Sequence, residues 1–121
     1  MAERIIETKS LALAVRIVKF YKFLYESKKE YVISKQILRS GTSIGANVRE
    51  SRNAQSDADF ISKLTIALKE ADETQYWLEV LFLSEVISQT EFDDINKDVK
   101  EVVAMLTAAV KKMKGKVKGE R

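Results

Sequence analysis

The sequence contains no cysteine, no histidine and no proline, and only four glycines. Without cysteine there are no disulfides or thiolate metal sites, and without histidine the commonest general base and metal ligand is missing. Scarce turn residues disfavour sandwiches and barrels of many short strands. No run approaches the roughly 18 apolar residues of a membrane span, and no secretory signal pattern is present. We therefore expect a cytoplasmic protein that uses no metal, cofactor or membrane.

The remaining composition is typical of one folded, soluble domain. The 121 residues are 45% hydrophobic and 32% charged, and this length is sufficient for a single core. The net charge of +3 is distributed unevenly, with +6 over residues 1–53, −8 over 54–104 and +5 over 105–121. These segments either neutralise one another within the fold or leave a cationic face for an anionic partner.

Apolar residues recur at helical spacing from about residue 3 to residue 27 and form two neighbouring stripes. The first stripe, which contains Leu13, Ile17, Phe20 and Leu24, is the expected core face. A second apolar stripe exceeds what one bundle core requires, so we expect it to contact another copy of the chain. This candidate oligomer interface consists of Leu11, Val15, Val18, Tyr21 and Tyr25.

Three further helices are predicted, over about 33–53, over 57–86 and from residue 89 onward, because apolar residues again recur every three or four positions. Short connections require neighbouring helices to lie antiparallel. The sequence therefore predicts an all-α protein, an antiparallel up-down-up-down four-helix bundle. We expect a single domain over residues 1–114 and a basic, flexible C-terminal tail over 115–121.

Hydroxyl side chains mark the start of each of these helices. Ser34 is the expected N-cap of the second helix, because its oxygen is able to accept from a backbone N–H. Ser56 followed by Asp59 predicts a cap on the third helix. Ser88 followed by Glu91 has the spacing of a capping box, with the hydroxyl and the carboxylate each bonding the other residue's N–H.

Two glycines lie inside the second predicted helix, at Gly41 and Gly45. Glycine in a helix interior costs up to ~1 kcal/mol relative to alanine, which is acceptable where a bulky neighbour needs the space. We expect Trp77 or another aromatic side chain to fill the space at Gly41. The segment lacks the preceding strand and the Lys-Ser/Thr pair of a phosphate-binding loop, so we assign no nucleotide site.

Several charged and amide side chains on the second helix have two possible roles. They are either solvated and locally paired or part of a structural polar network. If they face inward, burial requires mutual hydrogen bonds or a partner on the third helix. The candidate network consists of Arg39, Asn47, Glu50 and Glu73.

Lysines near the end of the chain and cations on the first helix form a candidate nucleic-acid surface. Cations at a helix C-terminus complement the helix dipole and also bind phosphates. Aromatic side chains do not alternate with them, so we expect little sequence preference. The candidates are Lys9, Arg16, Lys19, Lys22, Lys111, Lys112, Lys114, Lys116 and Lys118.

The segment Ser34–Glu50, SKQILRSGTSIGANVRE, resembles the signature of the four-helix bundle proteins related to the ribosomal RNA intervening-sequence protein. The similarity continues through Asp59–Thr74 and Tyr76–Leu78 and covers nearly the whole chain. The resemblance implies a four-helix monomer that assembles into a homopentameric ring. Such a ring is also found in the accessory protein of diversity-generating retroelements, which binds nucleic acid and a reverse transcriptase.

Two functions from different classes are compatible with these features. The first is a non-enzymatic homo-oligomer, a pentamer by resemblance, that binds RNA or DNA through basic surfaces with little sequence specificity. The alternative is a protein-interaction scaffold or adaptor that binds a protein partner and no nucleic acid. We expect no enzyme, because acidic pairs such as Asp57 and Asp59 lack a convergent partner motif and are explained by helix N-termini.

Overall fold

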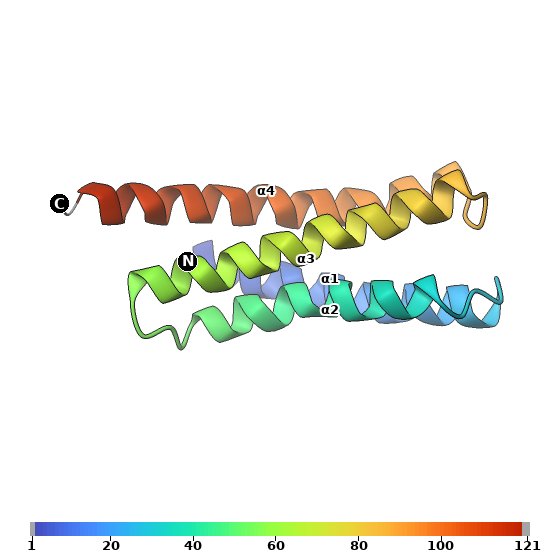
Figure 1. Cartoon of the computed structure of the whole chain (residues 1–121), viewed down its shortest axis with the longest axis horizontal. Coiled ribbons are helices and arrows are strands. Elements are labelled where there is room, and N and C mark those ends of the chain that lie inside the picture. The colour runs from blue at the N-terminus through green and yellow to red at the C-terminus, as the bar shows by residue number, and fades with distance from the viewer. Residues whose placement is uncertain (1, 120–121) are drawn as a thin grey trace.

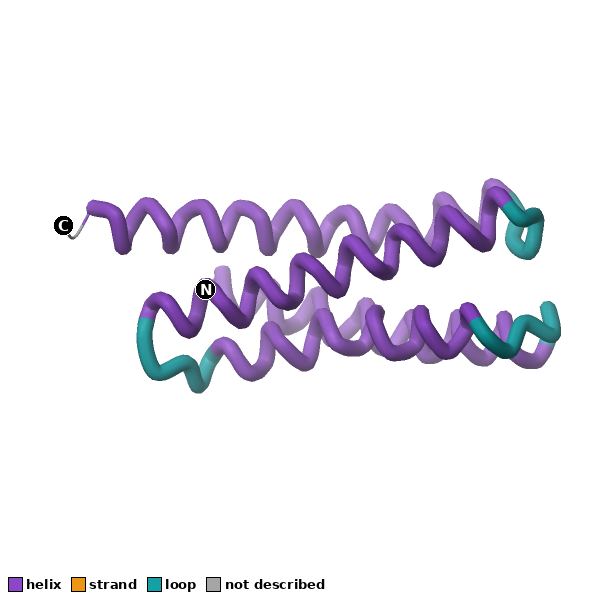
Figure 2. The backbone as a smooth tube through the Cα atoms, viewed as in Figure 1, coloured by secondary structure: helices purple, strands orange, loops and turns teal. Residues whose placement is uncertain are grey.

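The computed structural model describes residues 2–119, which form four α-helices and no strand (Figure 1). The predicted all-α fold with four helices is confirmed. α1 packs against α2 and α4, and α3 likewise packs against α2 and α4. The α1–α2 and α3–α4 loops lie at one end of the molecule, and the α2–α3 loop lies at the other (Figure 2). The helices are α1 Ala2–Glu26, α2 Ile33–Ser51, α3 Asp57–Leu83 and α4 Gln89–Gly119.

The hydrophobic core lies between the inward faces of all four helices. Ile17 of α1, Ile44 of α2, Leu78 of α3 and Leu106 of α4 have no exposed surface. Burial of one such side chain stabilises the fold by about 1.5–3 kcal/mol. Phe20, which belongs to the same predicted stripe as Ile17, is only partly buried and packs at the edge of this core. Helical periodicity therefore identifies the inward faces, and tertiary packing decides how deep each side chain lies.

Two predicted helix caps are confirmed. Ser56 Oγ accepts a hydrogen bond from the backbone N–H of Asp59 at 3.0 Å, and the Asp59 carboxylate accepts one from the N–H of Gln55 at 3.1 Å. At the start of α4, Ser88 Oγ accepts from the N–H of Glu91 at 3.1 Å, while Glu91 Oε1 accepts from the N–H of Ser88 at 2.8 Å. Reciprocal bonds of this kind satisfy amides that have no partner inside the helix.

The N-cap predicted at Ser34 is wrong. α2 begins at Ile33, so Ser34 lies within the first turn, where its side chain is fully buried and its Oγ has no hydrogen-bond partner among residues 2–119. The Glu30 carboxylate takes the capping role. It accepts from the N–H of Ser34 at 2.6 Å and from the N–H of Val32 at 3.2 Å. A side chain in the preceding loop thus stabilises this helix end.

α3 ends at Leu83, three residues before the predicted end at residue 86. The chain turns at Glu85, whose φ is 64°. Backbone N–H groups then bond back into the helix, from Val86 to Leu81 O at 2.9 Å and from Glu85 to Phe82 O at 3.0 Å. This is the Schellman arrangement, which usually has glycine at the left-handed position. The glutamate there gives no sequence signal for the helix end.

The two interior glycines bring α2 close to α1. A Cβ atom on Gly41 would lie 2.7 Å from Ile17 Cγ1 and Cγ2, and one on Gly45 would lie 3.0 Å from the backbone oxygen of Ser10. The prediction that Trp77 or another aromatic fills the space at Gly41 is wrong. An aliphatic side chain of α1 takes it instead, because α2 presents this glycine to α1 and not to α3.

α4 continues as a helix to Gly119, so residues 115–119 of the predicted tail are helical. Figure 1 shows the C-terminal end of α4 extending beyond the ends of the other three helices. Residues 120–121 of that tail lie outside the described residues. The division into a bundle over 1–114 and a flexible tail over 115–121 stays a prediction.

Candidate functional site

The outer face of α1 exposes large apolar side chains. Leu11 is 51% exposed, Val15 50% and Tyr25 38%, while Val18 and Tyr21 are partly buried. The core side of the same helix is fully occupied by other side chains. Three of the five candidate interface residues are therefore exposed in the monomer and two are partly covered, and an exposed apolar face of this kind favours self-association.

Tyrosine rings extend this apolar face at the end of α1. The ring centroids of Tyr21 and Tyr25 are 5.7 Å apart, and those of Tyr25 and Tyr31 are 4.7 Å apart in an edge-on arrangement. Tyr31 belongs to the α1–α2 loop and is 46% exposed. Spacing along the chain brings Tyr21 and Tyr25 together, one turn apart, whereas Tyr31 joins them only because the loop folds back.

Two of the candidate nucleic-acid cations are already paired with carboxylates of α4. Arg16 donates hydrogen bonds to the carboxylates of Asp94 and Asp98, and to the backbone oxygen of Asp94 at 3.0 Å. Lys9 Nζ lies 3.3 Å from Glu101. The hydrogen bond to Asp98 raises the pKa of Arg16 above its ordinary value, and the charges of both aspartates add to the effect. The basic first helix and the acidic start of α4 thus neutralise each other in part.

The other candidate cations are exposed and unpaired. Lys19 and Lys22 on α1 form no ion pair with any residue in the range 2–119. The same holds for the lysines on the last turns of α4. These are Lys111, Lys112, Lys114, Lys116 and Lys118. Among the candidate cations, unneutralised positive charge therefore remains at two places, the outer face of α1 and the end of α4.

A polar network connects α2 and α3, but it contains only two of the four predicted residues. Arg39 donates to Glu73, and its Nη1 lies 3.2 Å from Glu70 Oε2. Trp77 Nε1 donates to Glu73 Oε2 at 3.0 Å. Glu70 and Trp77 were not predicted, although they lie three and four residues from Glu73, the spacings at which helical side chains meet. The Arg39 side chain is half exposed, so this network lies at the surface.

The other two predicted network residues lie elsewhere. Asn47 Nδ2 donates to the backbone oxygen of Ser43 at 2.9 Å, one turn back in α2. Glu50 Oε1 lies 3.8 Å from Lys63 Nζ on α3. Neither side chain reaches Arg39. Their separation follows from helix geometry, because residues eight and eleven positions after Arg39 lie two and three turns further along α2.

Charge pairing shifts the pKa values of the network. The hydrogen bond from Arg39 lowers the pKa of Glu73 below its ordinary value, and the hydrogen bond from Trp77 lowers it further. The same pairing with Glu73, assisted by Glu70, raises the pKa of Arg39. Both groups therefore stay charged across the physiological pH range, which suits a structural contact better than proton transfer.

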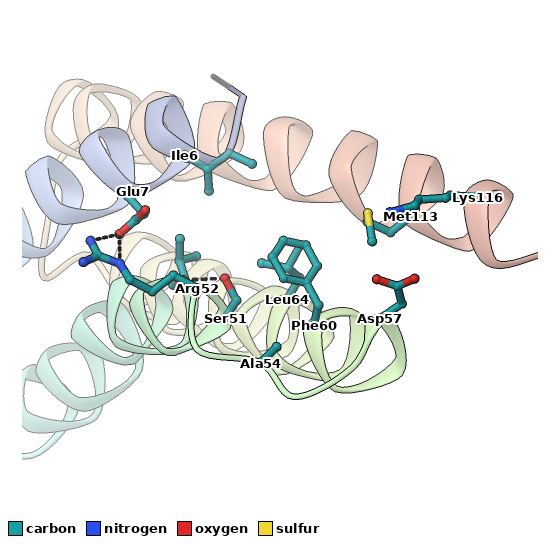
Figure 3. A pocket seen from close by; sticks show the side chains of 11 residues that line it. Ile6, Glu7, Ser51, Arg52, Ala54, Asp57, Phe60, Leu64, Met113 and Lys116 are labelled. Atoms are coloured by element: carbon teal, nitrogen blue, oxygen red, sulfur yellow. Dashed lines mark hydrogen bonds and ion pairs between the residues drawn. The ribbon is translucent and has the colours of Figure 1, made fainter.

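A pocket of about 360 Å³ opens at the end of the bundle that holds the α2–α3 loop (Figure 3). On one side, Arg52 Nε donates to Glu7 Oε1 at 3.0 Å; on the other lie Asp57 and Lys116. Lys116, one of the candidate nucleic-acid lysines, thus lines the mouth of an amphipathic cavity. The apolar walls come from Ile6, Val48, Phe60, Leu64 and Met113.

Comparison with models of protein families identifies the family of this chain. The model of the 23S rRNA-intervening sequence protein family matches residues 3–108. The chain belongs to this family. The resemblance noted in the sequence is therefore confirmed. The match includes α1, α2, α3 and α4 as far as residue 108, so the lysines from Lys111 onward lie outside the part shared with the 23S rRNA-intervening sequence protein family.

A solved structure with the same fold is similar to this 23S rRNA-intervening sequence family member. It is the crystal structure of a protein with unknown function from the S23 ribosomal protein family, from Bacteroides thetaiotaomicron. The two chains are 56% identical with a TM-score of 0.90, over 92% of this chain and 99% of the other. No curated protein matches the sequence.

The described part of this intervening-sequence family member offers no conventional metal centre. Among the side chains that the structure describes, over residues 5–119, no three acidic groups converge as metal ligands do. None of the helices in that range is both long enough and apolar enough to cross a membrane.

Proposed function

We propose that this chain is a non-enzymatic homo-oligomer, a pentamer of antiparallel four-helix bundles, that binds RNA or DNA through lysine contacts to phosphates. One observation carries the nucleic-acid part of the proposal. The lysines on the last turns of α4 are exposed and form no ion pair within residues 2–119, and the helix that carries them ends beyond the other three helices (Figure 1).

The position of these lysines suits a phosphate backbone. Lys111, Lys114 and Lys118 share one face of α4, because residues three, four and seven positions apart align on a helix. They extend over roughly 10 Å of helix, which corresponds to about three phosphates of one strand. By contrast, Lys9 and Arg16 would have to leave Glu101 and Asp98 before they contact a phosphate. The end of α4 is therefore the favoured contact.

Self-association would increase the affinity of such a surface. An oligomer repeats the lysine-rich helix end in every copy, so weak contacts to one nucleic acid add within a single complex. Support for the oligomer comes from the exposed Leu11 and Val15 on α1. The resemblance to the intervening-sequence family implies that the number of subunits is five.

Fluorescence anisotropy with labelled single-stranded RNA, measured from 50 to 200 mM salt, tests the nucleic-acid part. Binding should weaken steeply with salt because neutralised phosphates release counterions. Replacement of four lysines by glutamine should lower the affinity and reduce the slope of log K against log salt by about 2, since three of them share the contact face and each lost contact removes about 0.7. The four replaced positions are Lys111, Lys112, Lys114 and Lys118.

A matched variant distinguishes the loss of this particular surface from a general loss of positive charge. Four exposed lysines elsewhere are replaced by glutamine, which lowers the formal charge by the same amount, and the salt slope should stay close to that of the wild type. RNA binding that does not change between 50 and 200 mM salt, or equal losses in both variants, contradicts the proposed surface. The control positions are Lys29, Lys35, Lys69 and Lys97.

The amphipathic pocket favours a second candidate function, a protein-interaction scaffold. Its apolar walls, which include Phe60 and Met113, have the chemistry of a groove that takes an apolar side chain of a protein partner. Affinity capture after nuclease treatment distinguishes the two functions. Partners that persist after RNA and DNA are digested, and that are lost in a Phe60→Glu variant with unchanged helix content, favour the scaffold.

A further inference from the structure

The outer face of α3 carries an alternating row of apolar and acidic side chains. Asp72, Tyr76, Glu79 and Leu83 follow one another at spacings of four, three and four residues, so they share one face of the helix. Tyr76 is 57% exposed and Leu83 76% exposed. Neither carboxylate forms an ion pair with any residue from 2 to 119. We call these four residues the α3 stripe.

A groove of about 460 Å³ lies beside the α3 stripe, between α3 and α4, and contains a polar group without a partner. Asn96 of α4 lines this groove and is only 8% exposed, yet its Oδ1 accepts no hydrogen bond from residues 2–119. A buried acceptor that stays unpaired costs about 1–3 kcal/mol. Asp72 and Glu79 add two carboxylates to the lining of this groove, and Lys100 of α4 adds one cation.

The outer face of α1 has the complementary character. Leu11, Val15, Val18 and Lys22 follow one another at the same spacings of four, three and four residues. This α1 stripe is apolar with one exposed, unpaired lysine, whereas the α3 stripe is apolar with two unpaired carboxylates. Within the described residues the backbones of α1 and α3 are not neighbours, so the two stripes belong to opposite corners of the bundle.

We propose that the α3 stripe and its groove receive the α1 stripe of a second copy of this chain. Lys22 of one copy lies against Glu79 of the next, and Val18, one turn earlier on α1, covers Tyr76. This inference rests on the homo-oligomer proposed above. It specifies the second of the two surfaces that the oligomer requires.

The register of the two helices agrees with this pairing. Lys22 lies four residues before the end of α1 at Glu26, and Glu79 lies four residues before the end of α3 at Leu83. The loops that follow these two helix ends lie at the same end of the molecule (Figure 2). A rotation about an axis along the bundle therefore brings Lys22 and Glu79 to the same height.

The geometry also determines the type of assembly. The two stripes are different surfaces, so each contact is heterologous and leaves one free stripe at either end of any open chain of subunits. Such contacts end only when a ring closes. A ring with an odd number of subunits needs an interface of this kind, because a twofold contact joins copies in pairs.

Charge reversal tests the pairing directly. Lys22→Glu, Glu79→Lys and the combined variant are measured as full chains by light scattering coupled to gel filtration. At a concentration where the wild type is fully assembled, each single reversal should shift most of the protein to the mass of one chain. The combined variant should regain more than half of the assembled mass, because it restores opposite charges across the contact.

Two controls keep the test independent of folding. Lys35→Glu reverses an exposed lysine on α2 and should leave the assembled mass unchanged. Circular dichroism must give the wild-type helix content for every variant. Trp77, the single tryptophan, has its ring centroid 5.0 Å from that of Tyr76, so its emission should change on dilution as the stripe becomes exposed.

The possible failures are distinguishable. A wild-type chain that stays at the mass of one chain at high concentration contradicts both the oligomer and the α3 stripe. If the wild type assembles and Leu11→Glu separates it, but Glu79→Lys and Tyr76→Ala leave its mass unchanged, the oligomer stands and the α3 stripe is not its second surface. Single reversals that dissociate the oligomer without rescue in the combined variant contradict the pairing of Lys22 with Glu79.

Discussion

Gly41 of α2 lies so close to Ile17 of α1 that a Cβ atom at position 41 would come within 2.7 Å of the Ile17 side chain. Three of the atoms involved belong to a β-branched side chain with no exposed surface, so they have little room to move. The contact fixes the distance between α1 and α2.

Gly41→Ala should destabilise the fold. Overpacking of a close contact costs about 1–3 kcal/mol, which exceeds the gain of up to ~1 kcal/mol from the better helix former. Urea unfolding followed by circular dichroism measures the change. Gly115→Ala is the matched control, because nothing lies within 4 Å of a Cβ at that position, and it should leave stability unchanged or raise it. Equal effects at both positions would show that the contact with Ile17 is not the cause.

Ser88→Ala should lower the free energy of unfolding by about 1 kcal/mol, because the α4 capping box loses the hydroxyl that accepts from the Glu91 N–H. Ser34→Ala removes a buried hydroxyl with no partner among residues 2–119 and should be neutral or stabilising. The same unfolding measurement compares the two serines. A larger loss at Ser34 than at Ser88 would contradict the assignment of the caps.

Glu85→Gly should raise the free energy of unfolding by up to ~1 kcal/mol. Residue 85 has a φ of 64°, a conformation that glycine adopts without the steric cost that an L side chain carries. Thermal unfolding measures the shift. Glu85→Ala keeps the steric cost and removes only the carboxylate, so it should give no such gain.

The pairing of Glu73 with Arg39 predicts a loss of stability in acid. Because this contact lowers the pKa of Glu73, its contribution is fully present above the ordinary pKa of a glutamate and disappears as the pH falls through the lowered folded-state pKa. Glu73→Gln should flatten the decline of unfolding free energy below about pH 4.3. Chemical unfolding at a series of pH values measures this, and parallel curves for wild type and variant would argue against the contact.

Local sequence signals predicted the helices and the caps at Ser56 and Ser88, because each cap joins residues only three positions apart. Predictions failed where the partner came from another helix or loop. Nothing near Gly41 in the sequence indicates that Ile17 fills its space. Similarly, the side chain that caps α2 belongs to Glu30 in the preceding loop, which no pattern around Ser34 indicates.

For the candidate surfaces too, the sequence predicted what repeats along one helix and missed what depends on contacts between helices. Periodicity identified the apolar face of α1 because that face repeats along one helix. The lysine pattern did not reveal that Arg16 pairs with Asp98, because α1 and α4 are far apart in sequence and meet only in the fold. The α3 stripe was missed because its apolar positions are interrupted by Asp72 and Glu79, which makes it resemble a solvated helix face.

The mass of the chain in solution is the most direct test of the oligomer, measured by light scattering for the wild type and for Leu11→Glu. Leu11 is 51% exposed in the monomer, so the substitution leaves the core intact and changes only the outer face of α1. Val32→Glu, at a 71% exposed position in the α1–α2 loop, is the control. We predict that the wild type and Val32→Glu have about five times the 13.8 kDa of one chain and that Leu11→Glu has that of one chain. A wild-type mass of 13.8 kDa at high concentration would contradict the account.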